Sequence, residues 1–356
     1  MKTIYVLADG LTENPALGPM VIDEANVPNL QILAATGEAG WYHPATRPFA
    51  VGPETFVVFP YFFGMSPECN PGRAGLELSL AGVNLDLAPC SAVVRVVPLD
   101  FEPALGWEAA PPLSSPAVVE EVSRVARVAG VHVFRSPLSR RGNVFCVGAD
   151  CRESLDGFLC SLAAKLPRYG YLALPSQHSF VTTRSMPERE TTFFGWAMGG
   201  LHAALALCNV AIRQNDGMYN FDSLGDFPAK RRDLCERILP RVNVAQADAI
   251  IYLKEPSAFA RSGSRVRKRE AVEFVDWVVG ALLHEVSDYH ARIVVISDHR
   301  SDVGREETLP GAALYITGII GAARRGGVSA SPTRIADERA VLDQVSLVHR
   351  LRMMCE

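Results

Sequence analysis

Several features that would mark other classes of protein are absent from this sequence of 356 residues. Its 35 basic residues are outnumbered by 39 acidic ones, so no positive excess predicts binding to nucleic acid or to an anionic membrane surface. No apolar run reaches the ~18 residues that a membrane helix needs, and no basic segment followed by an apolar one marks a secretory signal. We therefore expect a cytoplasmic protein with neither a nucleic acid nor a membrane as partner.

Cysteine is also sparse. The chain has eight cysteines and no Cys-x-x-Cys pair, which argues against a disulfide framework and against a zinc cluster. Buried thiols are expected instead. The hydrophobic content of 48% is enough for the core of one large domain or two ordinary ones.

Two short β-branched segments, residues 3–8 and 291–297, have the pattern of central parallel strands. The acidic residues Asp9 and Asp298 stand at the carboxyl ends of these segments. Because ligand sites of open α/β sheets lie at this edge, the two carboxylates are predicted to meet there.

Helical patterns fill much of the chain between strands. A helix is predicted to begin at residues 27–30, and the Ala-rich apolar segment 193–213 is expected to form a buried helix. Residues 270–285 repeat apolar side chains at helical spacing before the strand that follows, as in a crossover unit. A further strand is predicted over residues 249–253, directly before Lys254.

The middle of the chain has a different texture. Two Pro-rich stretches, 98–116 and 167–175, have the composition of linkers. Between them the patterns predict a self-contained unit with a helix at 115–129, strands at 132–135 and 144–147, and a helix at 154–166. We interpret this unit as an inserted smaller domain.

His299 directly follows Asp298 in the segment VVISDHRSD. A carboxylate and an imidazole side by side at a strand end suit Zn, Mn or Fe, and Asp9 would add a second carboxylate. The hypothesis is one divalent metal held by Asp9, Asp298 and His299. The alternatives are a turn or cap for Asp9 and a structural role for the other two.

Thr55 lies in VGPETF, where a turn runs into the apolar segment 56–63. A hydroxyl at the start of a helix is close to free N–H groups, which also favour a phosphate. A metal lowers the effective pKa of such an alcohol, so Thr55 would be able to attack phosphorus near neutral pH. The alternative is an ordinary helix cap.

The order Asp9, Thr55 and Asp298-His299, together with DEANVPNLQILAATGEAG at residues 23–40, resembles the archaeal-type cofactor-independent phosphoglycerate mutases of the alkaline phosphatase superfamily. Two further stretches look like family segments: PGRAGLE at 71–77, similar to Gly-Arg-Gly-Pro-Leu-Glu, and residues 193–218, similar to the Tyr-Gly…Gly-Met helix. The similarity is collinear from residue 1 to about residue 320.

This resemblance implies an α/β fold. Its core would be alkaline-phosphatase-like, with a mostly parallel central sheet flanked by helices, and would comprise residues 1–90 and 173–356. A smaller inserted α/β cap domain, residues 91–172, would close over the substrate.

The resemblance also implies roles for individual residues. Thr55 would take the place of the family's serine nucleophile and would be a metal ligand with Asp9, Asp298 and His299. Four basic residues would bind the phosphate or carboxylate of the substrate: Arg73, Arg95, Arg141 and Lys254. For the arginines, ordinary surface charge is the alternative.

The sequence departs from the family at the second of its two metals, which an Asp-x-x-x-His pair helps to hold. In the segment KEPSAFARS at residues 254–262, Ser257 and Arg261 stand at those two positions, and the histidine expected soon after His299 is missing from SDVGREETLPGAALYI. We hypothesise that Arg261 replaces the second metal with a permanent cation and is itself a catalytic residue.

Three functions follow from these observations. The first is a phosphoglycerate mutase-like phospho-group transferase, mutase or phosphatase. It would act on a small phosphorylated or phosphonate acid through Thr55 and one metal, in a specialised biosynthetic pathway. The second is a degenerate, non-catalytic homologue that binds a phosphorylated ligand or a protein partner. The third is an enzyme of altered chemistry that forms no phosphoenzyme. The oligomeric state is left open.

Overall fold

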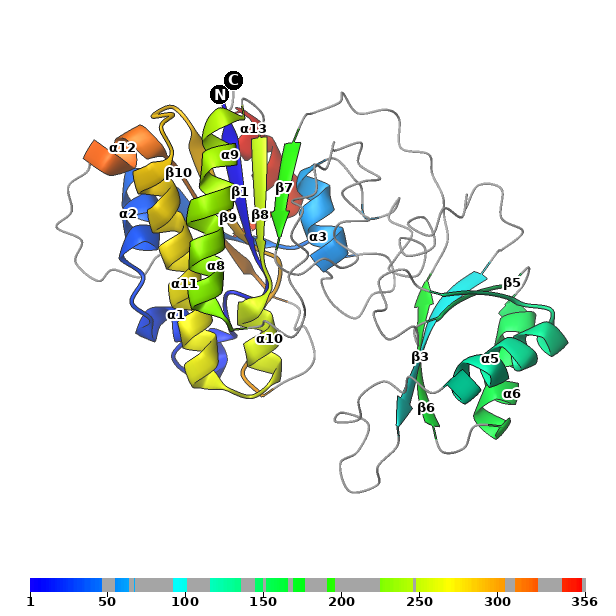
Figure 1. The fold of residues 1–356 in the computed structure, drawn as a ribbon. Coiled ribbons are helices and arrows are strands. Elements are labelled where there is room, and N and C mark those ends of the chain that lie inside the picture. The colour runs from blue at the N-terminus through cyan, green and yellow to red at the C-terminus, as the bar shows by residue number, and fades with distance from the viewer. Residues whose placement is uncertain are drawn as a thin grey trace. The chain divides into compact units, whose positions relative to one another are not determined.

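The computed structural model is shown in Figure 1. It describes residues 1–46, 55–63, 67, 92–100, 116–135, 145–149, 152–165, 169–176, 191–195, 225–245, 248–304, 311–325 and 341–353. The chain separates into two compact units. The core unit comprises Met1–Pro67, Ser185–Met198 and Leu205–Glu356, and the second unit comprises Glu68–Arg184 and Gly199–Ala204. The two are described separately.

The core unit is built on a seven-stranded sheet with the strand order β11-β2-β10-β9-β1-β8-β7. Its strands are β1 (Thr3–Ala8), β2 (Glu38–His43), β7 (Thr191–Gly195), β8 (Asp248–Leu253), β9 (Arg292–Ser297), β10 (Ala313–Ile319) and β11 (Val341–Asp343). Only β10 runs antiparallel to its neighbours, β9 and β2, and the other pairs are parallel. The predicted mostly parallel sheet is therefore confirmed, as are its three predicted strands β1, β8 and β9.

Helices cover both faces of this sheet (Figure 1). They are α1 (Val21–Glu24), α2 (Pro28–Thr36), α3 (Thr55–Phe62), α8 (Phe227–Asp233), α9 (Leu239–Val244), α10 (Glu255–Arg261), α11 (Arg265–Glu285), α12 (Ile320–Arg325) and α13 (Gln344–Met353). The described part of the unit also contains a short 3-10 turn, η1 (Pro15–Leu17), and a π-helical turn, η4 (Leu234–Ile238).

The two faces of β1 illustrate how the layers form, because successive side chains of a strand point to opposite sides. Ile4 and Val6 join the apolar cluster formed with α2, α8, α9 and α11. Tyr5 points to the opposite face, where its ring meets Phe63 at the end of α3. Both faces of β1 are buried, as expected for the centre of a three-layer α/β fold.

The start of helix α2 is stabilised by a side chain of the neighbouring helix α11. Pro28 is its first residue, and Val27 before it has no side chain that could cap the free N–H groups. Asp276 of α11 supplies the missing acceptor, since its Oδ1 accepts from the Leu30 N–H and its Oδ2 from Asn29 Nδ2, both at 2.8 Å.

The second unit contains a four-stranded antiparallel sheet with the order β4-β5-β3-β6. Its elements are β3 (Ala92–Asp100), α5 (Pro116–Ala129), β4 (His132–Arg135), β5 (Phe145–Ala149), α6 (Arg152–Lys165) and β6 (Tyr169–Ser176). The two helices and two strands predicted here are confirmed. The proposed domain bounds of 91–172 stay a prediction.

Several sequence predictions were wrong. The segment 193–213 was expected to be a helix, but its first three residues belong to β7, which pairs with β8, and residues 196–213 lie outside the described part of the chain. A short apolar run does not distinguish a buried strand from a buried helix. The Pro-rich stretch 167–175 was expected to be a linker, yet most of it forms β6. This strand is at the edge of its sheet, where a missing N–H is tolerated.

Pro98, at the start of the other expected linker, also lies in a strand. It belongs to β3. The pairing of β3 with β5 ends at Val96, so the strand that lies beside Pro98 is β6. The two cysteines whose side chains the structure describes, Cys160 and Cys235, are exposed and not buried as expected.

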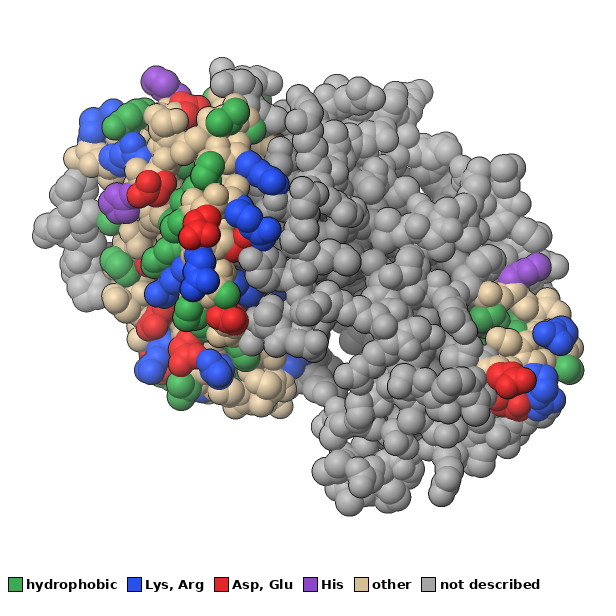
Figure 2. Space-filling view, viewed as in Figure 1, with side chains coloured by type: hydrophobic (Ala, Val, Ile, Leu, Met, Phe, Trp, Pro, Cys, Tyr) green, Lys and Arg blue, Asp and Glu red, His purple; other side chains and the backbone are tan. Residues whose placement is uncertain are grey.

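Charges of both signs alternate over α8, α9 and α11 on the face of the core unit seen in Figure 2. Among the described residues in that view, neither sign dominates. No helix within the described ranges is both long enough and apolar enough to cross a membrane.

Candidate metal centre

Strand register brings Asp9 and Asp298 together. Ala8 of β1 lies opposite Ser297 of β9 in a parallel pair, so the next residue of each strand leaves the sheet at the same edge. On the other side of β1, β8 ends level with it, since Leu253 lies opposite Ala8. This is the carboxyl edge at which ligands of such sheets bind.

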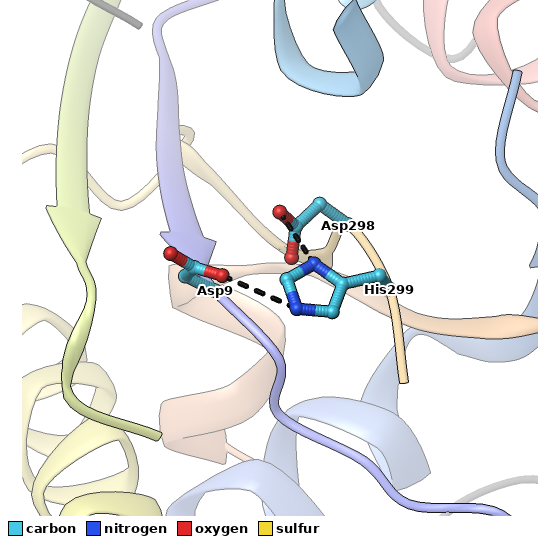
Figure 3. Close-up of side chains that lie close together, drawn as sticks. All are labelled: Asp9, Asp298 and His299. Carbon is cyan, nitrogen blue, oxygen red and sulfur yellow. Dashed lines mark ion pairs between the residues drawn. The ribbon is translucent and has the colours of Figure 1, made fainter. Parts of the chain in front are cut away.

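Figure 3 shows Asp9 after β1, facing Asp298 and His299 after β9. The Nε2 atom of His299 lies 3.6 Å from Oδ1 of Asp9, and its Nδ1 atom lies 2.9 Å from Oδ2 of Asp298. One ligand atom from each residue lies within 4.8 Å of the others, and all three side chains are buried. The sequence hypothesis named these same three residues as metal ligands, and the family resemblance added Thr55.

The unmet polar atoms of this cluster fit a metal ion. Among the described residues, neither Asp9 Oδ1 nor His299 Nδ1 has a hydrogen-bond partner. Nδ1 does lie 2.9 Å from Oδ2 of Asp298, with which it forms an ion pair when His299 is protonated. Burying such atoms unpaired is costly, whereas carboxylate oxygens and an imidazole nitrogen are the donors that Zn, Mn and Fe take.

Each carboxylate accepts a hydrogen bond from the β1 or β8 side of the site. Oδ1 of Asp298 accepts from the Gly10 N–H at 3.0 Å, and Oδ2 of Asp9 accepts from the Tyr252 hydroxyl at 2.9 Å. Partners of this kind orient the ligands of a metal site.

Gly10 is needed where it stands, between the strand and the loop that follows. Its φ of 64° is in the left-handed region, which favours glycine. A Cβ at this position would also lie 2.6 Å from Cβ of Ser301 and 2.8 Å from Cβ of Ser257. The backbone that donates to Asp298 is therefore packed too closely for any other residue.

The three groups also perturb one another electrostatically. Burial raises the pKa of Asp9, and the charge of Asp298 raises it further. Burial would lower the pKa of His299, but the two carboxylates outweigh it and the pKa is raised. For Asp298, burial is outweighed by His299, by Thr55 and by the Gly10 N–H, so its pKa is lowered. A bound cation would take the place of the proton that this pair of carboxylates attracts.

Thr55 reaches the cluster from the opposite layer. It is the first residue of α3, and its Oγ1 donates to Oδ2 of Asp298 at 2.5 Å. Three edge-on ring contacts hold α3 and the residue after it against the sheet: Phe59 on Tyr252, Phe62 on Tyr42 and Phe63 on Tyr5. The helix thus presents a hydroxyl, with neighbouring free N–H groups, to the candidate metal ligands.

Ser257 and Arg261, one turn apart on α10, border the same cluster. The Ser257 N–H donates to the carbonyl of Asp9 at 2.9 Å, and the Ser257 hydroxyl is 3.5 Å from Nε2 of His299. Nη2 of Arg261 donates to the Ser257 hydroxyl at 2.9 Å. Burial is the largest single influence on the pKa of Asp9, which it raises, and on the pKa of His299, which it lowers. The positive charge of Arg261 is a smaller influence and acts to lower both pKa values.

The remaining predicted site residues lie in different parts of the chain. Lys254 directly follows β8. Burial has the largest effect on the pKa of Asp9 and raises it, and the positive charge of Lys254 has a smaller effect that lowers it. Arg95 is in β3 of the second unit, opposite Cys146 and Leu174. Arg73 and Arg141 lie outside the described residues.

Sequence reasoning missed Tyr252 and Gly10, which orient the two carboxylates. Strand alternation carried a signal for Tyr252, since it places this residue on the face opposite to Leu253. It did not show that α3 covers that face, nor that the hydroxyl reaches Asp9. For Gly10, the only signal was a glycine directly after a strand-end aspartate.

Neither a family model nor a curated protein matches this chain. Among solved structures, the chain is similar to the PH0037 protein from Pyrococcus horikoshii, with a TM-score of 0.61 and 16% identity over 99% of this chain and 97% of the other. It is also similar to the cofactor-independent phosphoglycerate mutase from Thermoplasma acidophilum, with a TM-score of 0.50 and 13% identity over 100% of both chains.

The alkaline phosphatase of the Antarctic bacterium TAB5 matches with a TM-score of 0.34 and 9% identity over 99% of this chain and 96% of the other. That similarity is too low to carry an argument. The predicted α/β fold with its mostly parallel central sheet is confirmed by the sheet topology and by the likeness to the structures from Pyrococcus horikoshii and Thermoplasma acidophilum. At these identities the comparisons establish the fold alone, and an activity has to be argued from the site.

Proposed function

We propose that this protein is a phosphoglycerate mutase-like phospho-group transferase or phosphatase that uses Thr55 and one divalent metal. The observation that carries the proposal is the 2.5 Å hydrogen bond from Thr55 Oγ1 to Oδ2 of Asp298, a residue that also belongs to the candidate metal cluster. A hydroxyl, a carboxylate that accepts its hydrogen bond and a set of candidate metal ligands therefore meet at one strand edge, which supports these roles.

The chemical step uses groups of this chain. As Thr55 Oγ1 forms a bond to phosphorus, its proton passes by way of Oδ2 of Asp298 to solvent. The bond from phosphorus to the leaving oxygen breaks, and that oxygen takes a proton from solvent. Water or a second acceptor hydroxyl then takes the phosphoryl group from Thr55 and loses one proton to solvent, while Thr55 Oγ1 regains a proton through Asp298. A divalent metal on Asp9, Asp298 and His299 would offset the negative charge that builds up on the reacting oxygens.

Arg261 is proposed to supply part of the charge that a second metal would bring. Ser257 and Arg261 offer a hydroxyl and a guanidinium where related mutases are expected to have a carboxylate and an imidazole. The bond from Arg261 to Ser257 holds the cation beside the cluster, and a guanidinium can stabilise phosphoryl oxygens by paired hydrogen bonds.

The proposed substrate is a small phosphorylated or phosphonate acid of a specialised biosynthetic pathway. Four cations would bind its acidic groups: Arg73, Arg95, Arg141 and Lys254. Of these, Lys254 has support from its place at the carboxyl edge of the sheet, next to the strand that holds Asp9.

One alternative is a non-catalytic homologue that binds a phosphorylated ligand or a protein partner. It is favoured by the presence of Ser257 and Arg261 at the positions where the second metal's ligands are expected.

Another alternative is an enzyme that forms no phosphoenzyme, because Ser257, His299 and Asp298 follow one another in space as the members of a hydrolytic triad do. The burial of Ser257 argues against such a triad, because this side chain is fully buried and a triad needs an accessible hydroxyl.

The experiment combines metal analysis with hydrolysis of a generic aryl phosphate. We expect about one Mn, Zn or Fe per chain, and a loss of roughly 10³-fold or more in kcat for Thr55→Ala. Thr55→Ser should retain most of the activity. Thr36→Ala, which removes a threonine hydroxyl that donates to a backbone carbonyl within α2, is the matched control. Equal activity of the wild type and Thr55→Ala would exclude Thr55 as nucleophile, and metal and phosphate binding without turnover would favour the alternative.

A further inference from the structure

We infer that Tyr252 is a positioning residue of the metal centre, holding one oxygen of Asp9 so that the other faces the ion. The inference deepens the proposed function and rests on the metal site proposed there. Its basis is the hydrogen bond from the Tyr252 hydroxyl to Asp9 Oδ2, at 2.9 Å.

Both partners of this bond are buried: Tyr252 is 5% exposed and Asp9 2%. The other carboxylate oxygen, Oδ1, has no hydrogen-bond partner among the described residues and lies 3.6 Å from Nε2 of His299. One oxygen is thus held by the protein while its neighbour is directed at the other ligands. Because a carboxylate on a flexible side chain would otherwise rotate, this bond selects the orientation in which Asp9 can bind a metal.

Tyr252 also contacts the layer that carries the nucleophile. Its ring meets Phe59 of α3 edge-on, with 6.2 Å between the ring centroids and 75° between the planes. Thr55 is the first residue of that helix. One side chain therefore connects the metal ligand Asp9 to the helix that presents the attacking hydroxyl, which gives Tyr252 two separable contacts.

Tyr315 provides a matched comparison. It too belongs to a strand of the sheet and is buried, and its hydroxyl donates to a carboxylate oxygen, Oε1 of Glu38, at 2.5 Å. Glu38 is not one of the clustered metal ligands. Removing either hydroxyl deletes a hydrogen bond of the same type, but only one deletion releases a proposed metal ligand.

The test is calorimetric titration of metal-free full-length protein with Mn²⁺ and, separately, Zn²⁺. We expect Tyr252→Phe to weaken metal binding roughly 10- to 100-fold, and Tyr315→Phe to change it by no more than about twofold. Phe59→Leu, which reduces the ring contact but keeps the hydroxyl, should bind as the wild type does. Thermal melts verify folding, and titrations repeated in sucrose, which favours the folded state, keep the comparison valid for a destabilised variant.

The outcomes separate this inference from the proposal on which it rests. A wild-type protein that binds neither ion would overturn the metal centre, and this role of Tyr252 with it. If the wild type binds and Tyr252→Phe binds equally tightly, the centre stands and the positioning role is wrong. A loss in Phe59→Leu as large as that in Tyr252→Phe would also contradict it, because packing and not the hydroxyl would then control binding.

Discussion

The carboxylate of Asp276 should control part of the pH dependence of this protein's stability. It caps α2 from the neighbouring helix and accepts two hydrogen bonds, from the Leu30 N–H and from Asn29. Both bonds favour the charged form. Burial opposes them and is the larger effect, so the pKa of Asp276 is raised from 3.8 to about 6.

The sign of the effect follows from proton linkage. A folded-state pKa above the unfolded value means that the folded protein binds the proton more tightly, so this stabilisation is present below about pH 4 and is lost as the pH rises through about 6. One pKa unit corresponds to 1.36 kcal/mol, which gives about 3 kcal/mol between the two ends of this range. Asp276→Asn removes the titration and keeps an oxygen that can accept from Leu30.

The assay is urea unfolding of the wild type and Asp276→Asn at several values between about pH 4 and about pH 7. Relative to the wild type, the variant should gain roughly 3 kcal/mol in free energy of unfolding as the pH rises through this range. Asp23→Asn, which changes an exposed aspartate of α1, controls for the loss of a negative charge. A difference between Asp276→Asn and the wild type that stays flat or falls with rising pH would refute the reasoning.

Two further predictions concern the loops beside the candidate metal centre. Lys268→Met should lower the free energy of unfolding by about 3–5 kcal/mol, because Lys268 is fully buried and lies 3.0 Å from Glu13. Adding Glu13→Leu should recover part of this loss in urea unfolding, and no recovery would contradict the ion-pair argument. Gly10→Ala should cost roughly 1–3 kcal/mol from its backbone conformation alone, and more from the clash with Ser257 and Ser301. It should also weaken Mn²⁺ binding, and unchanged stability and affinity would show that the loop adapts.

Much of the core was predictable because its signals are local. The strands around Asp9 and Asp298 are short β-branched runs, and such runs end where the ligands of an α/β sheet gather. The Asp-His pair adds the donor chemistry of a metal site. These signals need only a few consecutive residues, which is why the three candidate ligands could be named before their distances were known.

Other features depended on contacts that no local pattern encodes. Residues 193–195 became a strand because β8 offered a parallel partner, and the Pro-rich segment around Pro175 became an edge strand because β3 lies beside it. Apolar periodicity alone does not identify a strand's partner.

By itself, the sequence determined the α/β class, the three candidate metal ligands and the hydroxyl at the start of a helix, because each depends on residue types close together in the chain. Only the tertiary structure decided which atoms meet. Thr55 contacts Asp298, and Tyr252 contacts Asp9, across 243 positions in each case. Strand register and the packing of α3 set these distances, and they arise only when distant segments share one core.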